Sequence, residues 1–326
     1  MVRLTVVLLA TASFVPPPAR PLIIAHRGAS GYRPEHTLEA YRLAVEMGAD
    51  FIEPDLVSTK DGVLVARHEN EIGRTTDVAV RFPGRKRRAI VDGRWLTGWF
   101  TEDFTLAELK TLRARERLPS RSHEYDGQFL IPTFDEVIAL AQDLGYRRGR
   151  DVGIYPETKH PAYFRRIGRP LEEPLLASLA KAGWDRADAP VFIQSFDRAS
   201  LRALASKTKV RLVQLVNRSS QVTDASLRTI ATYAAGIGAA KNLVQPIRVH
   251  GALGTPTDLV ARAHAAGLLV HVWTLRADRQ FLPAGYAGDP IAECLRFRSV
   301  GVDGFFIDQP DVAVRAFASG VHAGSR

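Results

Sequence analysis

Short apolar runs typical of β-strands alternate with helical patterns along almost the whole chain after residue 21. The strand-like runs cover residues 22–26, 51–57, 63–68, 151–159, 191–196, 210–216, 236–240, 268–275 and 302–308. The helical patterns cover residues 37–47, 134–144, 171–182, 198–206, 224–234, 257–266 and 290–299. Strand–helix alternation of this extent indicates a parallel sheet, and a closed (β/α)8 TIM barrel matches it best. The chain of 326 residues, 46% of them hydrophobic, is long enough to bury the core of one such barrel.

The nine strand-like runs exceed the eight places of the barrel by one. The runs 51–57 and 63–68 are joined by the turn STKDG, which is too short for a crossover between parallel strands. Either this pair departs from the simple strand–helix unit, or one run, GIGAA at 236–240, is irregular.

Residues 70–132 interrupt the alternation with a polar segment rich in glycine and arginine. A short helix is expected at 105–114, with Thr105 as its N-cap and Glu108 at the capping-box spacing. An insertion of this length after the third strand is expected to lie over one mouth of the barrel. We interpret its basic run RKRR, residues 85–88, as a solvated loop or as a rim that attracts phosphate.

The N-terminus predicts export. Arg3 is followed by an apolar run to Ala10 and then by small residues, the pattern of a signal peptide, and a proline-rich spacer follows. We therefore expect residues 1–20 to be a signal peptide with its spacer, residues 21–326 to form the barrel domain, and the protein to act outside the cytoplasm, secreted or in the cell envelope. No later run is long enough to cross a bilayer. Cys294 is the single cysteine, which excludes an intrachain disulfide, and a buried packing role is expected for it.

The chain is basic, with a formal net charge of +9 and a pI of about 9.9. Such a charge favours phosphate-bearing partners or anionic surfaces, but a biased genome composition explains it equally well. We expect a small-molecule substrate, no nucleic-acid partner and no stable membrane insertion, and the sequence leaves the oligomeric state open.

Three carboxylates are placed where a strand should meet the mouth of the barrel. Glu53 and Asp55 are two residues apart and therefore share one face of the predicted strand 51–57, and Glu157 occupies a similar place in 151–159. Such a cluster needs a cation, and oxygen ligands without cysteine suit Ca²⁺ or Mg²⁺. Separate salt bridges with Arg27 or Lys159 are the alternative interpretation.

Two histidines, His26 and His68, each follow an apolar strand, where the catalytic face of a barrel is expected. Histidine can act as general base or general acid, and the neighbouring Arg27 and Lys159 can bind phosphate oxygens. Together with a divalent ion, these groups are what displacement at a phosphodiester requires.

The sequence resembles the glycerophosphodiester phosphodiesterase family, in its exported branch with a long insertion. The resemblance rests on AHRGASGYRPEHTLEAY, GADFIEPDLVSTKDGVLVARHE, YPETK, FIQSF, VHVWTL and GVDGFFIDQPD, which span nearly the whole chain after residue 21. It implies a (β/α)8 barrel that hydrolyses glycerophosphodiesters to sn-glycerol 3-phosphate and an alcohol. His36 departs from the family, whose members usually have asparagine there, and a structural hydrogen bond near Glu35 and the start of the helix at Thr37 is expected for it.

The resemblance also implies a role for each motif residue. The implied acid/base pair is His26 and His68; the metal ligands are Glu53, Asp55 and Glu157; the phosphate contacts are Arg27 and Lys159; and the aromatic residues near the glycerol end of the substrate are Phe196 and Trp273. We expect one divalent cation, Ca²⁺ rather than Mg²⁺, with His26 as the base and His68 as the acid. The nucleophile is either water or the neighbouring glycerol hydroxyl, and analogy with related barrels favours the hydroxyl.

Two other functions remain open at this point. A related barrel enzyme of the phospholipase C or D type would act on whole phospholipids, but the polar insertion 70–132 argues against an apolar rim for it. A non-enzymatic phosphate-binding barrel would be favoured by the loss of a metal ligand or a histidine, and the sequence has lost neither.

Overall fold

The computed structural model describes residues 20–318 of the chain. The predicted signal peptide and spacer, residues 1–20, lie outside this part except for Arg20. Within the described part, no helix combines the length and the apolar character that a membrane crossing requires.

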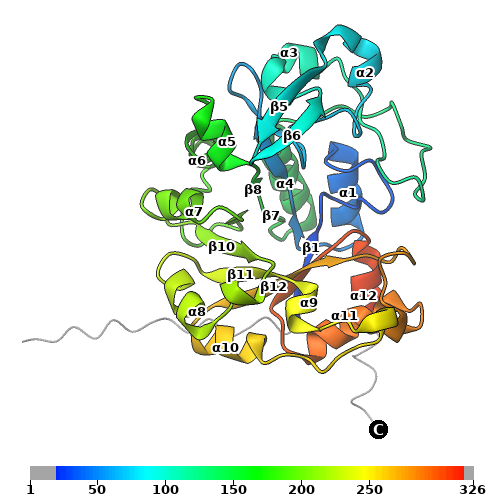
Figure 1. The fold of residues 1–326 in the computed structure, drawn as a ribbon, viewed down its shortest axis with the longest axis vertical. Coiled ribbons are helices and arrows are strands. Elements are labelled where there is room, and N and C mark those ends of the chain that lie inside the picture. The colour runs from blue at the N-terminus through cyan, green and yellow to red at the C-terminus, as the bar shows by residue number, and fades with distance from the viewer. Residues whose placement is uncertain (1–19, 319–326) are drawn as a thin grey trace, which may run out of the picture.

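Eight parallel strands form a closed ring at the centre of the molecule (Figure 1). Two of them are interrupted and carry two labels each. The ring consists of β1 (Leu22–Ala25), β2 (Phe51–Ile52) with β3 (Asp55–Ser58), β7 (Gly153–Ile154) with β8 (Glu157–Thr158), β9 (Phe192–Ser195), β10 (Arg211–Val216), β11 (Gly236–Ala240), β12 (Leu269–Leu275) and β13 (Gly304–Ile307). All neighbouring pairs are parallel, and β13 pairs with β1 to close the ring. The predicted (β/α)8 barrel is therefore confirmed.

The surplus strand-like run is 63–68. It forms β4 (Leu64–Ala66), which lies outside the ring. It pairs antiparallel with β3, and Leu56 lies opposite Ala66. The pair joined by STKDG therefore departs from the simple strand–helix unit, as the short turn requires. The other explanation is wrong, because GIGAA forms the regular strand β11 with a parallel partner on each side.

Both interruptions in the ring contain a proline, which has no N–H to donate to a ladder. The hydrogen bonds continue through the proline carbonyls. Pro54 accepts from the N–H of Glu157 at 3.0 Å, and Pro156 accepts from the N–H of Gln194 at 2.9 Å. The strands therefore change course at these points without leaving the barrel.

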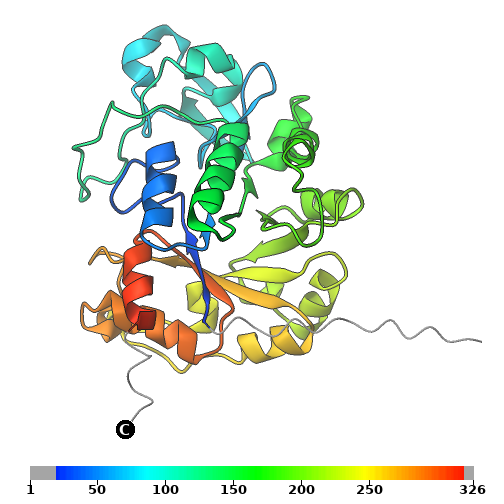
Figure 2. The same ribbon diagram turned by 180° about the vertical axis from the view of Figure 1, so that it is seen from behind.

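Eight helices follow the barrel strands in turn and surround the ring, as the two opposite views show (Figures 1 and 2). They are α1 (Leu38–Glu46), α4 (Phe134–Arg148), α6 (Glu172–Lys181), α7 (Arg198–Ala205), α8 (Asp224–Ile230), α10 (Leu259–Ala265), α11 (Pro290–Ser299) and α12 (Pro310–Ala318). Their starts are specified locally: the Thr37 side chain accepts the N–H of Ala40, and Thr133 forms a capping box with Glu136. Two shorter helices, α5 (Pro161–Arg166) and α9 (Lys241–Val244), follow β8 and β11.

The core has two layers. A large apolar layer, which includes the buried Cys294, fills the space between ring and helices. A smaller cluster fills the inside of the ring, where Tyr155 stacks on Phe192 with ring centroids 5.0 Å apart and meets Phe306 edge-on at 5.0 Å. These rings close the barrel, so the cavity described below is confined to its mouth.

The insertion forms a lobe at one end of the molecule's long axis in both views (Figures 1 and 2). It comprises α2 (Val78–Arg81), the hairpin β5 (Arg87–Val91) and β6 (Arg94–Gly98), and α3 (Leu106–Leu109). The lobe buries apolar side chains, among them Phe100, Phe104 and Leu109, and these belong to the same continuous apolar cluster as the core around the barrel. The predicted capping box of Thr105 with Glu108 is present, although its helix is shorter than expected.

The interpretation of RKRR as a loop is wrong in part. Arg85 ends a short 3₁₀ helix (Pro83–Arg85), and Arg87 and Arg88 begin β5, so only Lys86 lies outside a helix or strand. Arg87 is half-buried, with its Nη2 3.1 Å from Oε1 of Glu102, whereas Arg85, Lys86 and Arg88 are exposed, as expected of a solvated run.

Candidate active site

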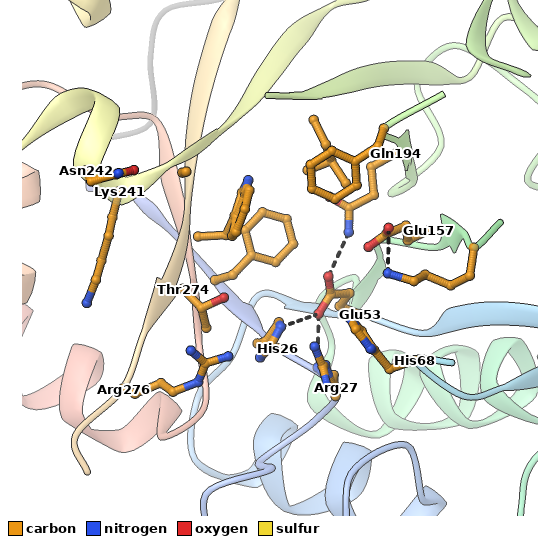
Figure 3. A pocket seen from close by; sticks show the side chains of 16 residues that line it. His26, Arg27, Glu53, His68, Glu157, Gln194, Lys241, Asn242, Thr274 and Arg276 are labelled. Carbon is orange, nitrogen blue, oxygen red and sulfur yellow. Dashed lines mark hydrogen bonds and ion pairs between the residues drawn. The ribbon is translucent and has the colours of Figure 1, made fainter. Parts of the chain in front are cut away.

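The C-terminal ends of the barrel strands surround a cavity of about 350 Å³ (Figure 3). Eight of the nine site residues predicted from the sequence line it: His26, Arg27, Glu53, His68, Glu157, Lys159, Phe196 and Trp273. The ninth, Asp55, is only 1% exposed and lies behind the cavity wall. The sequence motifs therefore converge on one site.

The three carboxylates fit a divalent cation. Glu53, Asp55 and Glu157 each offer an oxygen, and these oxygens lie within 4.8 Å of one another. Oδ1 of Asp55 is buried and has no hydrogen-bond partner among the described residues, so it is free to serve as a ligand. A set of oxygen donors without sulfur or imidazole suits a hard ion such as Ca²⁺ or Mg²⁺.

The raised pKa values of the clustered carboxyl groups also indicate that an additional positive charge would stabilise their ionised forms. Burial and the neighbouring charges of Asp55 and Glu157 raise the pKa of Glu53 well above its usual value. Burial raises the pKa of Glu157 to about 7, although Lys159 opposes this shift. The protein cations alone therefore do not neutralise the cluster.

The ion pairs of the alternative interpretation are present as well. Nζ of Lys159 lies 3.0 Å from Oε1 of Glu157, and Nε of Arg27 lies 3.5 Å from Oδ2 of Asp55. Each carboxylate has two oxygens, and each of these ion pairs engages only one of them. The other oxygen of Glu157 and of Asp55 remains available to a metal ion. Ion pairing and metal binding are therefore compatible here, and both cations still line the cavity.

His36 has the structural role expected for it, but with different partners. Its Nε2 lies 2.9 Å from Oδ2 of Asp55, and its Nδ1 lies 2.8 Å from the Tyr41 hydroxyl. Its backbone has a φ of +58°, a left-handed conformation that asparagine and histidine tolerate better than most residues. His36 thus orients a candidate metal ligand, whereas Glu35 pairs with Arg27 at 3.0 Å.

His26 follows β1 and is held from behind by Asp308, which follows β13. Its Nδ1 lies 2.6 Å from Oδ1 of Asp308, so Nε2 is the atom left to exchange a proton. Burial and then the charge of Arg27 lower the pKa of His26 to about 3, although Asp308 opposes the shift. The ring is therefore neutral, the state that a general base requires.

His68 reaches the site by a route that differs from the prediction. It follows β4, which is antiparallel, so it does not lie at the end of a barrel strand. The hairpin β3–β4 instead returns the chain to the level of Asp55, whose carbonyl accepts the N–H of Arg67 at 2.9 Å. Figure 3 shows His26 and His68 beside Glu53.

The ring of His68 is oriented by a carboxylate, as that of His26 is. Its Nδ1 lies 2.8 Å from Oε1 of Glu69. Burial and the charges of Arg27 and Lys159 lower the pKa of His68 to about 4. A phosphate anion beside these two cations would oppose that effect and favour the protonated ring.

The two predicted aromatic residues form one wall of the cavity. Phe196 and Trp273 meet edge-on with ring centroids 5.6 Å apart, and Nε1 of Trp273 donates to the carbonyl of Gly238 at 2.8 Å. Phe196 is 42% exposed, which leaves its ring accessible to a ligand.

Several polar residues of the site were not predicted. Gln194 donates to Oε1 of Glu53 at 2.7 Å. Asp308 also accepts hydrogen bonds from Arg276 and from Arg121, which belongs to the insertion. Asp308 ends the predicted strand 302–308, and Gln194 lies in the last three residues of the predicted strand 191–196, which is the signal that could have identified them.

Comparisons with known proteins agree with this geometry. Residues 26–312 match the model of the glycerophosphoryl diester phosphodiesterase family. A glycerophosphodiester phosphodiesterase from Arabidopsis thaliana is 42% identical over 317 residues, which cover 89% of this chain and 84% of that protein. One from Haemophilus influenzae is 32% identical over 341 residues and covers 92% of this chain and 90% of its own length.

Solved structures show the same fold. A phosphodiesterase from Oleispira antarctica, in complex with its product sn-glycerol-3-phosphate, superposes with a TM-score of 0.67 at 22% identity, over 92% of this chain and 97% of that one. A glycerophosphodiester phosphodiesterase from Agrobacterium tumefaciens gives a TM-score of 0.61 at 22% identity, over 90% and 99%. The chain therefore belongs to the glycerophosphoryl diester phosphodiesterase family of phosphoric diester hydrolases.

Proposed function

We propose that this enzyme hydrolyses glycerophosphodiesters to sn-glycerol 3-phosphate and an alcohol, with His26 and His68 as the acid–base pair and one divalent cation. The observation that carries the proposal is the composition of the cavity of about 350 Å³ at the barrel mouth. Two histidines, each backed by a carboxylate, line it together with two cations and two of the three clustered acids.

The bound cation is proposed to be Ca²⁺, held by Glu53, Asp55 and Glu157. When bound, it would supply positive charge that stabilises the phosphoryl oxygens. Arg27 and Lys159 would add to this effect from the protein side, because both line the cavity.

The two histidines divide the proton transfers. Nε2 of His26 takes the proton from the nucleophile, and Asp308 stabilises the resulting cation. His68 donates a proton to the alkoxide as its bond to phosphorus breaks. The exposure of the two rings supports this order, because the His26 side chain is 9% exposed, whereas the His68 side chain is 30% exposed and so more accessible to a departing alcohol.

The nucleophile we favour is the neighbouring glycerol hydroxyl. Its oxygen bonds to phosphorus, the alcohol leaves, and water then opens the cyclic phosphate. Direct attack by water is the alternative. Phosphorus NMR during turnover separates the two routes, because only the first produces a cyclic glycerophosphate.

The function is tested with the purified protein after removal of metal. A panel of glycerophosphodiesters is assayed for sn-glycerol 3-phosphate, with Ca²⁺ and Mg²⁺ added back separately. We expect activity that depends on the added ion, and hydrolysis of intact phospholipids in preference to the panel would contradict the proposal.

Export is proposed on the sequence of residues 1–20 alone. We expect cleavage between about Ala12 and Arg20, because small residues follow the apolar run there. N-terminal sequencing of the protein from its native host tests this, and an intact Met1 on a cytosolic protein would refute it.

A further inference from the structure

The tip of the β5–β6 hairpin, in the insertion lobe, stands beside the catalytic mouth. The turn consists of Asp92 and Gly93, with φ of +47° and +77°, and Asp-Gly is a preferred pair for a two-residue hairpin turn. The tip borders a second cavity of about 650 Å³. This cavity shares Glu157, Lys159 and Phe196 with the catalytic one.

His160 connects the hairpin tip to the barrel. It follows β8, has a φ of +50° and directly precedes Pro161, a combination that a residue other than glycine rarely adopts. Its Nδ1 lies 2.6 Å from Oδ2 of Asp92, and its Nε2 lies 2.9 Å from Oε2 of Glu69. Burial opposes a positive charge on the ring, but hydrogen bonds with Glu69 and Asp92 raise the pKa of His160 above its usual value.

Glu69 connects His160 to His68. Its Oε2 contacts His160, and its Oε1 lies 2.8 Å from Nδ1 of His68. The Glu69 side chain is 46% exposed, and an exposed glutamate loses conformational entropy when it is held in one orientation. A contact with His160 therefore restricts Glu69 where burial does not.

We propose that the insertion positions the general acid of the reaction: Asp92 orients His160, His160 orients Glu69, and Glu69 fixes the ring of His68 so that Nε2 faces the leaving alcohol. Asp92 and His160 are positioning residues in this scheme and do not touch the substrate. The inference rests on the proposed role of His68 as the acid. It gives the insertion a direct part in catalysis.

The test uses two substrates whose leaving groups differ in their need for a proton. Glycerophosphocholine releases a basic alkoxide, whereas a 4-nitrophenyl ester of glycerol phosphate releases a phenolate that leaves without protonation. Asp92→Gly removes the carboxylate and keeps the turn, because glycine accepts a positive φ. We expect about a tenfold loss of kcat on glycerophosphocholine, the size of one lost hydrogen bond to a charged group, with KM unchanged. The nitrophenyl ester should react at the normal rate.

Three further variants complete the design. His160→Asn tolerates the left-handed backbone but cannot span both carboxylates, so it should behave as Asp92→Gly does. Asp92→Asn keeps an acceptor without the charge and should restore part of the rate. Arg88→Ala is the matched control: it removes a side chain on the same hairpin that packs over Trp95 at 4.1 Å, outside the chain of contacts. It should leave both rates unchanged, and thermal melting shows that each variant is folded.

The outcomes separate the two levels of the proposal. If His68→Ala slows both substrates equally, the acid role of His68 is wrong, and the positioning proposal fails with it. If His68→Ala is selective for glycerophosphocholine but Asp92→Gly and His160→Asn are not, the positioning proposal alone is overturned. Equal losses in those two variants and in Arg88→Ala would show that the hairpin acts only through stability.

Discussion

The barrel has two parts that differ in how their strands reach the site. We call the continuous strands β9 to β13 the regular half, and the strands β2–β3 and β7–β8 the interrupted half. From β9 to β13 the strands are continuous, and their inward side chains near the ring centre are largely apolar, such as Phe192, Val213 and Phe306. The two strands interrupted at proline, β2–β3 and β7–β8, instead direct buried carboxylates toward the mouth. Apolar packing is shared by the whole ring, because Phe51 and Tyr155 of the interrupted strands belong to the same inner cluster, whereas the clustered carboxylates are confined to the interrupted strands.

The proposed metal ligands belong to the interrupted half, and the loss of the metal should have the largest effect. Chelation should abolish activity and lower the melting temperature, because the ion binds only the folded protein. Glu53→Gln should weaken Ca²⁺ binding by at least about 100-fold, the upper range for changes around a metal site. Calorimetric titration with Ca²⁺ measures the affinity.

A matched control comes from the other half. Glu293 is equally buried and pairs with Lys241 at 2.7 Å, so Glu293→Gln removes a buried charge away from the cluster and should keep Ca²⁺ affinity. Full activity of the unmodified enzyme in excess chelator would show that no metal is needed.

Substitution of the two proposed acid–base histidines should have the next largest effect. His26→Ala and His68→Ala should each reduce kcat on glycerophosphodiesters by roughly 10²- to 10⁴-fold, the usual contribution of a general acid or base. Metal affinity and fold should persist. The control His123→Ala changes an exposed histidine that pairs with Asp126, and it should keep the rate. Near-normal rates in both alanine variants would mean that other groups transfer the protons.

Arg121 tests the connection from the insertion to His26. Its guanidinium binds Asp278 at 2.9 and 2.7 Å and also contacts Asp308, the partner of His26. Arg121→Ala should reduce kcat about tenfold, as expected for one lost hydrogen bond between charged groups. Because His26 is the proposed base, hydrolysis of glycerophosphocholine and of the nitrophenyl ester should slow alike.

Arg121→Lys keeps the charge but loses the planar fork, so an intermediate rate is expected. Selectivity for glycerophosphocholine in either variant would instead assign the acid role to His26.

The smallest effect on turnover should come from the packing of the regular half. Leu201 of α7 is fully buried, and Leu201→Ala should lower the free energy of unfolding by about 2–5 kcal/mol through loss of contacts and a cavity. Its kcat at a temperature where the protein remains folded should be unchanged. Urea denaturation measures the first quantity and steady-state kinetics the second. A large fall in kcat would show that the halves are coupled.

Local patterns in the sequence determined much of this protein. Apolar periodicity located the barrel strands, and the threonine caps at Thr37 and Thr105 marked two helix starts. The short turn STKDG showed that two strands could not be parallel neighbours, which the antiparallel pairing of β3 and β4 confirms. The motifs also named the residues that line the catalytic cavity, because parallel strands carry their ends to the same mouth.

Tertiary structure alone decided which residues support that set. Asp308 is 282 positions from His26, and Gln194 is 141 from Glu53, so no local pattern links either pair. The polar composition of the insertion likewise concealed a folded lobe whose hairpin tip contacts His160 and whose Arg121 contacts Asp308, the partner of His26. A local pattern reports what near neighbours in the chain favour, whereas these contacts form only when the closed ring brings distant segments together.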